Sequence, residues 1–161
     1  MSYIDKNLME SERVIYRSGI HWHIFIWPVI WFLAALVTFG FEINMKEADT
    51  RLAMLAAGGF FLFLSLILFV PRWIRYISSE FGITNRRVIL KVGMFHRKSL
   101  EVLLNKVESI LVNQSTFGTV MGFGSITVTG TGGTKDTFHN ISHPDKFRKK
   151  VEEQIAVIQD R

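Results

Sequence analysis

The pattern of apolar and polar positions divides the chain into three regimes. Residues 24–41 and 52–70 are apolar runs without a charged side chain, separated by a polar stretch at 42–51. Each run has about the ~20 residues that a helix needs to cross ~30 Å of hydrocarbon. The pattern predicts a two-helix membrane hairpin within residues 21–75, preceded by a polar segment at 1–20. Acidic residues and no cleavage pattern argue against a secretory signal.

After the second run, the apolar period changes to two residues. Apolar and polar residues alternate around 81–83, 88–92 and 110–112, and strictly over 125–129, as in half-buried strands. Gly132 and Gly133 separate two strand-like runs, where a hairpin turn needs positive φ angles. An antiparallel β-sheet is therefore predicted.

The last stretch changes period again. Residues 144–159 carry Phe147, Val151, Ile155 and Ile158 at spacings of three or four, which predicts one face of an amphipathic helix. Residues 76–161 are thus expected to form one β domain followed by a C-terminal helix.

Aromatic and basic side chains gather at the start of the first span and the end of the second. Indole and phenol rings favour the headgroup boundary, so we expect membrane-interface anchors at Trp22, Trp27, Trp31, Arg72, Trp73, Arg75 and Tyr76. Basic residues near the spans are concentrated on the side of both termini, with only Lys46 and Arg51 in the connecting loop. The positive-inside rule then predicts cytoplasmic termini.

Composition narrows the function classes. The chain has no cysteine, which excludes disulfides, thiol nucleophiles and cysteine-ligated metal centres. A net charge of +5 suits a basic cytoplasmic face, and no nucleic-acid motif accompanies it. Neither apolar run contains an ionisable side chain, so a self-contained transporter is not expected.

The motifs that could carry chemistry have simpler interpretations. Thr129 to Asp136 lacks the Gly-Lys-Ser/Thr order of a phosphate loop, and Gly122-Phe123-Gly124 lacks the helix of a dinucleotide site. The pairs His21/His23 and His139/His143 have no third metal ligand, so interfacial or surface histidines are expected. We therefore expect no cofactor, no metal and no enzymatic activity.

Several motifs together carry a family resemblance. They are TNRR at 84–87, KVESI at 106–110, Gln114-Ser115, GFG at 122–124, VTGTGG at 128–133 and the segment ERVIYR at 12–17. With them, nearly the whole chain resembles the bacterial pleckstrin-homology-like (bacterial PH domain) membrane protein family. Thr119 departs from the basic residue that relatives often have there, which weakens any anion-binding role at that position.

The resemblance implies a fold and a location, without an agreed activity. The fold is a pleckstrin-homology-like sandwich or partly open barrel of about seven strands, closed by the C-terminal helix, on a membrane α-helical hairpin. The location is the bacterial inner membrane, crossed more than once. Membrane lipids and an unknown protein, or a second copy in a homo-oligomer, are the expected partners, and nucleic acid is not.

Three functions stay open from the sequence. The leading hypothesis is a non-enzymatic interaction module that binds proteins or copies of itself, through an open sheet edge for example. The second is a sensor of anionic lipid headgroups, and the third an auxiliary subunit of a membrane enzyme or transporter. For lipid or partner binding the candidates are Arg86, Arg87, Lys91, Arg97, Lys98 and Lys106.

Overall fold

The computed structural model describes residues 3–43, 46–93, 98–133 and 135–159, which belong to two compact units. One unit comprises Trp22–Ile74, and the other comprises Met1–His21 together with Arg75–Arg161. The polar segment at 1–20, predicted as a separate region, therefore belongs to the same unit as the β domain. Each unit is described by itself below.

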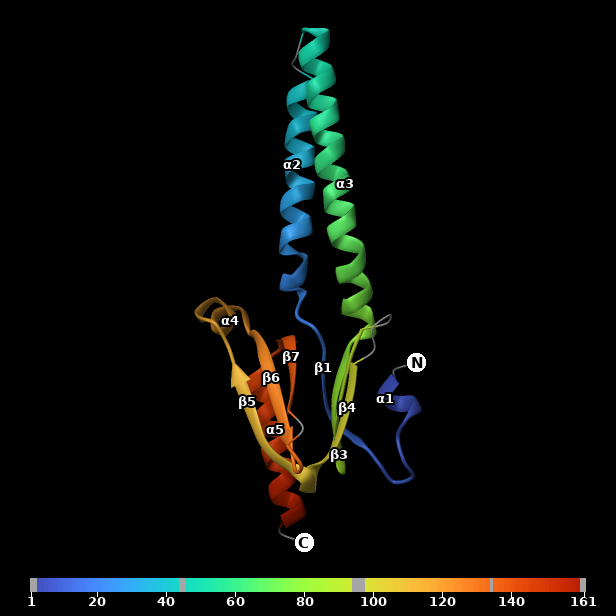
Figure 1. Ribbon diagram of the computed structural model, residues 1–161, viewed down its shortest axis with the longest axis vertical. Coiled ribbons are helices and arrows are strands. Elements are labelled where there is room, and N and C mark those ends of the chain that lie inside the picture. The colour runs from blue at the N-terminus through green and yellow to red at the C-terminus, as the bar shows by residue number, and fades with distance from the viewer. Residues whose placement is uncertain (1–2, 44–45, 94–97, 134, 160–161) are drawn as a thin grey trace. The chain divides into compact units, whose positions relative to one another are not determined.

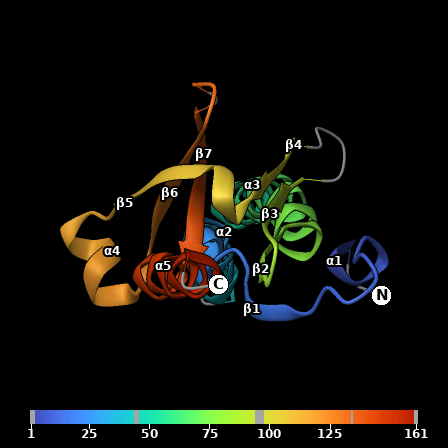
Figure 2. The same ribbon diagram turned by 90° about the horizontal axis from the view of Figure 1, so that it is seen from below.

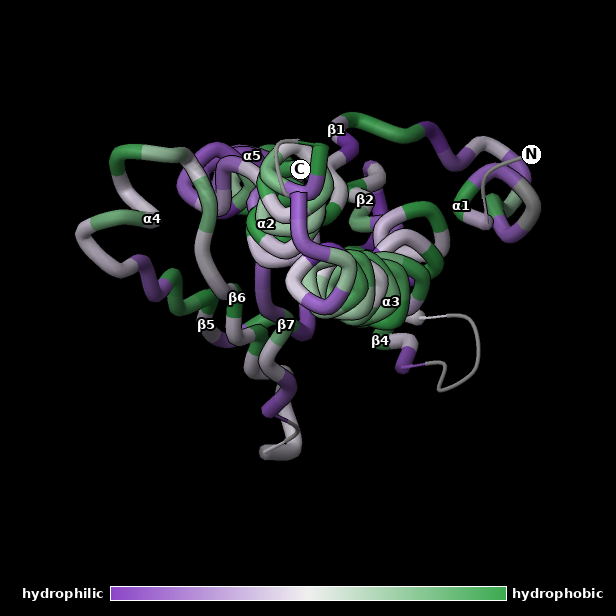
Figure 3. The backbone as a smooth tube through the Cα atoms, turned by 90° about the horizontal axis from the view of Figure 1, so that it is seen from above, coloured by the Kyte–Doolittle hydropathy of each residue, from purple (hydrophilic) through white to green (hydrophobic). Residues whose placement is uncertain are grey.

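The helical unit is an apolar hairpin. A short 3₁₀ turn, η1 (Trp22–Phe25), leads into α2 (Ile26–Glu42), and α3 (Ala48–Ser78) returns. Both helices are long and apolar enough to cross a membrane, and only 11% of the most apolar window of each is buried. Figure 3 shows mainly apolar colouring on α2 and α3. Large side chains such as Leu33 and Phe63 are more than half exposed, unlike those of a soluble core helix.

Small residues allow the two helices to approach closely. A Cβ on Gly58 would lie 2.8 Å from Cε1 of Phe39 and 2.9 Å from Oγ1 of Thr38. The Ser65 hydroxyl donates a buried hydrogen bond of 2.9 Å to the carbonyl oxygen of Pro28. Gly58 therefore lies directly against α2, whereas Gly59 has no neighbour within 4 Å of its Cβ position.

The second helix is longer than the predicted span. It continues through Pro71 to Ser78, and Arg72 Nη1 donates 2.8 Å to the Leu68 carbonyl oxygen. Proline removes one helical donor but does not end a helix whose flanking residues continue the pattern. The predicted end at residue 70 marks the end of the uncharged run, not of the helix.

The β unit contains two antiparallel sheets (Figure 1). The first has the order β1-β2-β3-β4 and the second β5-β6-β7. Seven strands are therefore present in the described residues, as the family resemblance implies. The elements are α1 (Tyr3–Lys6), β1 (Val14–Ser18), β2 (Glu80–Thr84), β3 (Arg87–Val92), β4 (Lys98–Leu103), η2 (Leu104–Lys106), β5 (Val107–Asn113), α4 (Thr116–Met121), β6 (Phe123–Gly130), β7 (Lys135–Ser142) and α5 (Pro144–Gln159).

The first strand of the domain precedes the apolar hairpin in sequence. β1 pairs with β2 in antiparallel register, for example Ser18 with Phe81 and Arg17 with Gly82. Two neighbouring antiparallel strands are usually joined by a short turn. In this chain the whole apolar hairpin takes the place of that turn, so the domain is assembled from both sides of the insertion.

The core follows the predicted alternation and the predicted helix face. Ile126 and Val128 are fully buried, as are Phe147 and Val151 on α5. The bounds of α5 agree with the predicted helix at 144–159. Gly132 and Gly133 have φ angles of 110° and 78° in the turn between β6 and β7, as predicted for a glycine turn.

The outer face of the first sheet is also covered at β2 and β3, which the sequence pattern did not predict. Ile89 is as buried as its neighbours Val88 and Leu90, although alternate residues of a strand point to opposite faces. The reason is α1, whose Ile4 is 1% exposed and packs where Gly82 has no side chain. The carboxylate of Glu80 accepts hydrogen bonds from the first backbone N–H groups of α1.

Candidate functional site

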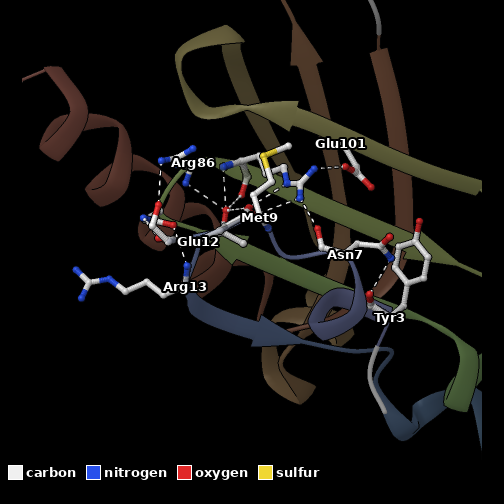
Figure 4. A network of polar contacts seen from close by, with 11 residues as sticks. Tyr3, Asn7, Met9, Glu12, Arg13, Arg86 and Glu101 are labelled. Atoms are coloured by element: carbon white, nitrogen blue, oxygen red, sulfur yellow. Dashed lines mark hydrogen bonds and ion pairs between the residues drawn. The ribbon is translucent and has the colours of Figure 1, made fainter.

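A buried ion pair joins two of the motifs that carry the family resemblance, ERVIYR at 12–17 and TNRR at 84–87. Arg87 Nε and Nη2 each donate 2.9 Å to the two carboxylate oxygens of Glu12, in a bidentate arrangement. Arg87 also donates 2.7 Å to Glu101 and 2.6 Å to the carbonyl oxygen of Asn7. The Glu12 side chain is fully buried and that of Arg87 is 10% exposed. Figure 4 shows these contacts.

Further donors complete the environment of the Glu12 carboxylate. The Thr84 hydroxyl donates 2.7 Å to Oε1, and the Met9 backbone N–H donates 2.9 Å to Oε2. Burial alone would raise the pKa of Glu12, but the hydrogen bonds from Arg87, Met9 and Thr84 and the Arg87 charge together lower it below 4.5. The ionised pair is thus compensated on every side, as a buried pair must be.

The same network fixes the turn between β2 and β3. Oγ1 of Thr84 accepts from the backbone N–H groups of Arg86 and Arg87. Asn85 and Arg13 exchange two hydrogen bonds, one through the Asn85 side chain and one through its backbone N–H. The Asn85-Arg86 turn is therefore held against the segment that leads into β1.

An open groove lies beside this turn. It has a volume of about 560 Å³ and is lined by Ser11, Asn85, Arg86, Leu103, Asn105 and Ile158. Arg86 Nη2 donates 3.2 Å to the Ser11 hydroxyl, so its guanidinium is placed at the groove wall. Leu103 is 44% exposed and offers an apolar surface beside the amides.

A smaller hollow continues from the groove along α5. Its volume is about 130 Å³, and it shares Asn105 and Ile158 with the groove while adding Val107, Ile155 and Gln159. Together the two hollows combine apolar side chains, three side-chain amides and one guanidinium. Such a lining can bind an extended peptide, with amides for its backbone and a cation for a carboxylate.

The direction of the strands shows at which end of the domain the groove lies. β2 runs from Glu80 to Thr84 and β4 from Lys98 to Leu103, so the turn at Asn85 and the corner at Asn105 share one end of the strands. His21 and Arg75, where the chain passes to the helical unit, belong to the opposite end. Figure 2 views the domain from the groove end, with the C-terminal part of α5 in front.

The structure does not bring the predicted basic residues into one face. Arg87 is buried in the pair with Glu12, and its prediction as an exposed binding residue is wrong. The error has a physical origin, because its partner lies 75 positions away in sequence. The signal available was that the segment at 12–17 contains the acidic Glu12, whereas the segment at 84–87 contains the basic Arg86 and Arg87.

The other basic candidates occupy separate places. Lys98 forms an ion pair of 2.6 Å with Asp136, and Lys91 lies 3.8 Å above the centre of the Tyr3 ring. Lys106 is exposed at the groove end, where its carbonyl oxygen accepts from Thr131 N–H. Arg97 lies outside the described residues. Of the five candidates that the structure describes, Arg86 alone lines the groove.

Six of the seven predicted interface anchors lie near the ends of the helical hairpin, whereas Trp31 is the sixth residue of α2. Trp22, Trp27 and Trp73 are about half exposed or more, and Tyr76 is 38% exposed. Trp31 packs on Phe61 with ring centres 5.6 Å apart. Arg72 donates to the helix backbone, and the Arg75 carbonyl oxygen accepts from the Ser79 hydroxyl.

The predicted surface position of the histidines does not hold for His21. This residue is only 6% exposed, and its ring lies 5.4 Å from that of Phe123. Burial, and next the nearby His143, lower the pKa of His21. Within the described ranges, no cluster of three or more metal-ligating side chains is present.

The comparisons agree with this architecture. No curated protein matches the chain. The sequence model of one family, described as the bacterial PH domain, matches residues 31–155. This match covers most of the chain and includes the TNRR turn and the corner at Asn105 that border the groove. The chain therefore belongs to the bacterial PH domain family.

Proposed function

We propose that this protein is a non-enzymatic, membrane-anchored module that binds a carboxylate-bearing segment of a partner protein. The observation that carries the proposal is the groove between the Asn85-Arg86 turn, the β4–β5 corner and the end of α5. The exposed apolar hairpin supports anchorage in a membrane. The excess of basic residues on one side of it supports cytoplasmic termini at a bacterial inner membrane.

The groove chemistry favours an acidic peptide over other ligands. Arg86, Arg13 and Lys106 are exposed and provide cations at this end of the domain. Leu103 and Ile158 can bury apolar side chains of the ligand, while Asn105 can satisfy its backbone. A rim of fixed polar groups around a few apolar contacts is typical of peptide recognition.

Recognition of an anionic lipid headgroup has less support as the principal function. It would need several cations converging at one place, and the candidates are divided between a buried pair, a surface ion pair and the groove. The groove also lies at the end of the strands away from the two connections to the helical unit. β5, which begins at the groove end, has seven residues, so its two ends lie ~20 Å apart.

The proposal can be tested by photo-crosslinking in intact membranes. A photoreactive amino acid is placed at Leu103 or Asn105 in the groove, and at Glu152 on the exposed face of α5 as a control. We expect one discrete protein adduct from both groove positions and none of that mass from Glu152. Mass spectrometry then identifies the partner and the crosslinked segment.

Charge reversal provides the matched control. Arg86→Glu should abolish the adduct, whereas Arg148→Glu, at an exposed residue of α5 with a loose 3.8 Å ion pair, should leave it unchanged. Lipid adducts alone would favour the headgroup hypothesis. An adduct to a second copy of the chain would identify self-association, and equal yields from all three positions would refute a specific groove.

A further inference from the structure

The short helix between β5 and β6 presents apolar side chains outward. Phe117 is 56% exposed and Val120 is 81% exposed. They are three positions apart, so they lie on one face of α4. Residues 109–134 contain no charged side chain. Isolated exposed apolar residues are common, so exposure alone does not identify a contact surface. The position and rigidity of these two residues are the further evidence.

The corner that presents them is firmly built. The Ser115 hydroxyl accepts from Gly118 N–H at 3.0 Å and caps the helix, and Gln114 Nε2 donates 3.0 Å to the Phe123 carbonyl oxygen. Gly122 ends the helix with φ of 80°, a left-handed conformation that glycine adopts without strain. The exposure of Phe117 and Val120 is therefore fixed by the fold.

This corner belongs to the end of the domain from which the apolar hairpin leaves. The Phe117 ring lies 5.9 Å from the Phe123 ring, which lies 5.4 Å from the His21 ring. His21 directly precedes Trp22, the first residue of the candidate span. Two ring contacts and one peptide bond thus connect the exposed face of α4 to the start of an apolar helix.

We propose that α4 is an additional membrane contact, in which Phe117 and Val120 enter the headgroup region of the bilayer that holds α2 and α3. The inference rests on the proposed membrane anchorage. Transfer of an apolar side chain from water into such a boundary is favourable in free energy. An uncharged helix has no ionic group whose desolvation would oppose this transfer. This contact needs no anionic lipid, in contrast to a basic patch.

The absence of native cysteine makes single-site labelling possible. Val120→Cys carries an environment-sensitive fluorophore in the full chain, reconstituted in vesicles whose lipids bear a nitroxide quencher near the headgroup. Thr131→Cys, exposed in the β6–β7 turn at the groove end, is the aqueous control. Phe63→Cys, 62% exposed on α3, reports insertion of the hairpin through a deep nitroxide.

We expect several-fold stronger quenching at position 120 than at position 131, equal in neutral and anionic vesicles and insensitive to salt. If the probe at position 63 is quenched but that at 120 resembles 131, the contact is refuted while anchorage stands. If the probe at 63 is unquenched, anchorage fails and this inference with it. Protection of position 120 from an aqueous quencher without lipid quenching would show a protein cover and would also overturn the proposal.

Discussion

Removal of the buried guanidinium should loosen the first sheet strongly. In Arg87→Met the Glu12 carboxylate, whose side chain is fully buried, loses both bonds to its counter-ion. It keeps only the Met9 N–H and the Thr84 hydroxyl. Breaking a buried pair from one side costs about 3–5 kcal/mol, because an uncompensated charge remains inside.

Hydrogen exchange of the full chain in mild detergent can measure this loss. The four tryptophans all lie in Trp22–Ile74, so intrinsic tryptophan fluorescence would report mainly on the other unit. Peptides from β2 and β3 report directly on the sheet that contains Arg87. Since each ~1.4 kcal/mol is a factor of ten, their exchange should accelerate by about 10²-fold to about 4 × 10³-fold.

The adjacent arginine supplies a matched control. Arg86→Met removes an exposed side chain with a 3.2 Å bond to Ser11, and surface changes of this kind usually stay within about 0.5 kcal/mol. The double variant Glu12→Gln/Arg87→Met should lose less than the two single variants added together, since no buried charge is left unpaired. Equal exchange in Arg87→Met and Arg86→Met would refute a structural role for the pair.

Three further outcomes follow from the contacts. The pKa of Glu12 in the folded state is lowered from its ordinary value, so its stabilisation is present above the unfolded-state pKa and is lost as the pH falls through the folded-state pKa; thermal unfolding measured from neutral pH into the acid range should show this loss, and Glu12→Gln should flatten it. Gly118→Ala places a Cβ 2.6 Å from a backbone carbonyl oxygen, whereas Gly19→Ala meets nothing within 4 Å; hydrogen exchange around α4 should rise by the equivalent of about 1–3 kcal/mol in the first and stay unchanged in the second. Ser65→Ala removes the bond to the Pro28 carbonyl oxygen and should weaken the hairpin by only about 0.6 kcal/mol in a steric-trapping assay; a loss several times larger would show that this bond organises the helix pair.

Local periodicity predicted the core positions of strands and helices that bury only one face. Ile126 and Val128 alternate with threonines, and Phe147 and Val151 recur at helical spacing, so core positions could be read from neighbours in sequence. Ile89 could not be assigned this way. Its burial depends on Ile4, a residue of a short helix far away in the chain.

The candidate site was less predictable for the same reason. An arginine in a turn-forming motif has the pattern of a surface residue, and only the fold shows that Arg87 meets Glu12. The groove joins a turn, a corner and a helix end, whose residues 11, 85, 105 and 158 are widely separated in sequence. Periodicity cannot indicate that such segments meet. The family resemblance includes the TNRR turn and the KVESI motif that follows the corner, but it does not show that they are close in space.

The inserted hairpin gives the domain two covalent connections where a tail anchor would give one. β1 and β2 are neighbouring antiparallel strands, paired as far as Ser18 and Phe81, so the two connections leave from adjacent backbones ~5 Å apart. The short distance between the two connections depends on β1–β2 pairing, to which α1 adds by packing Ile4 against Gly82 on the same sheet. An N-terminal segment of a few residues therefore helps to hold together the two strands between which the apolar hairpin is inserted.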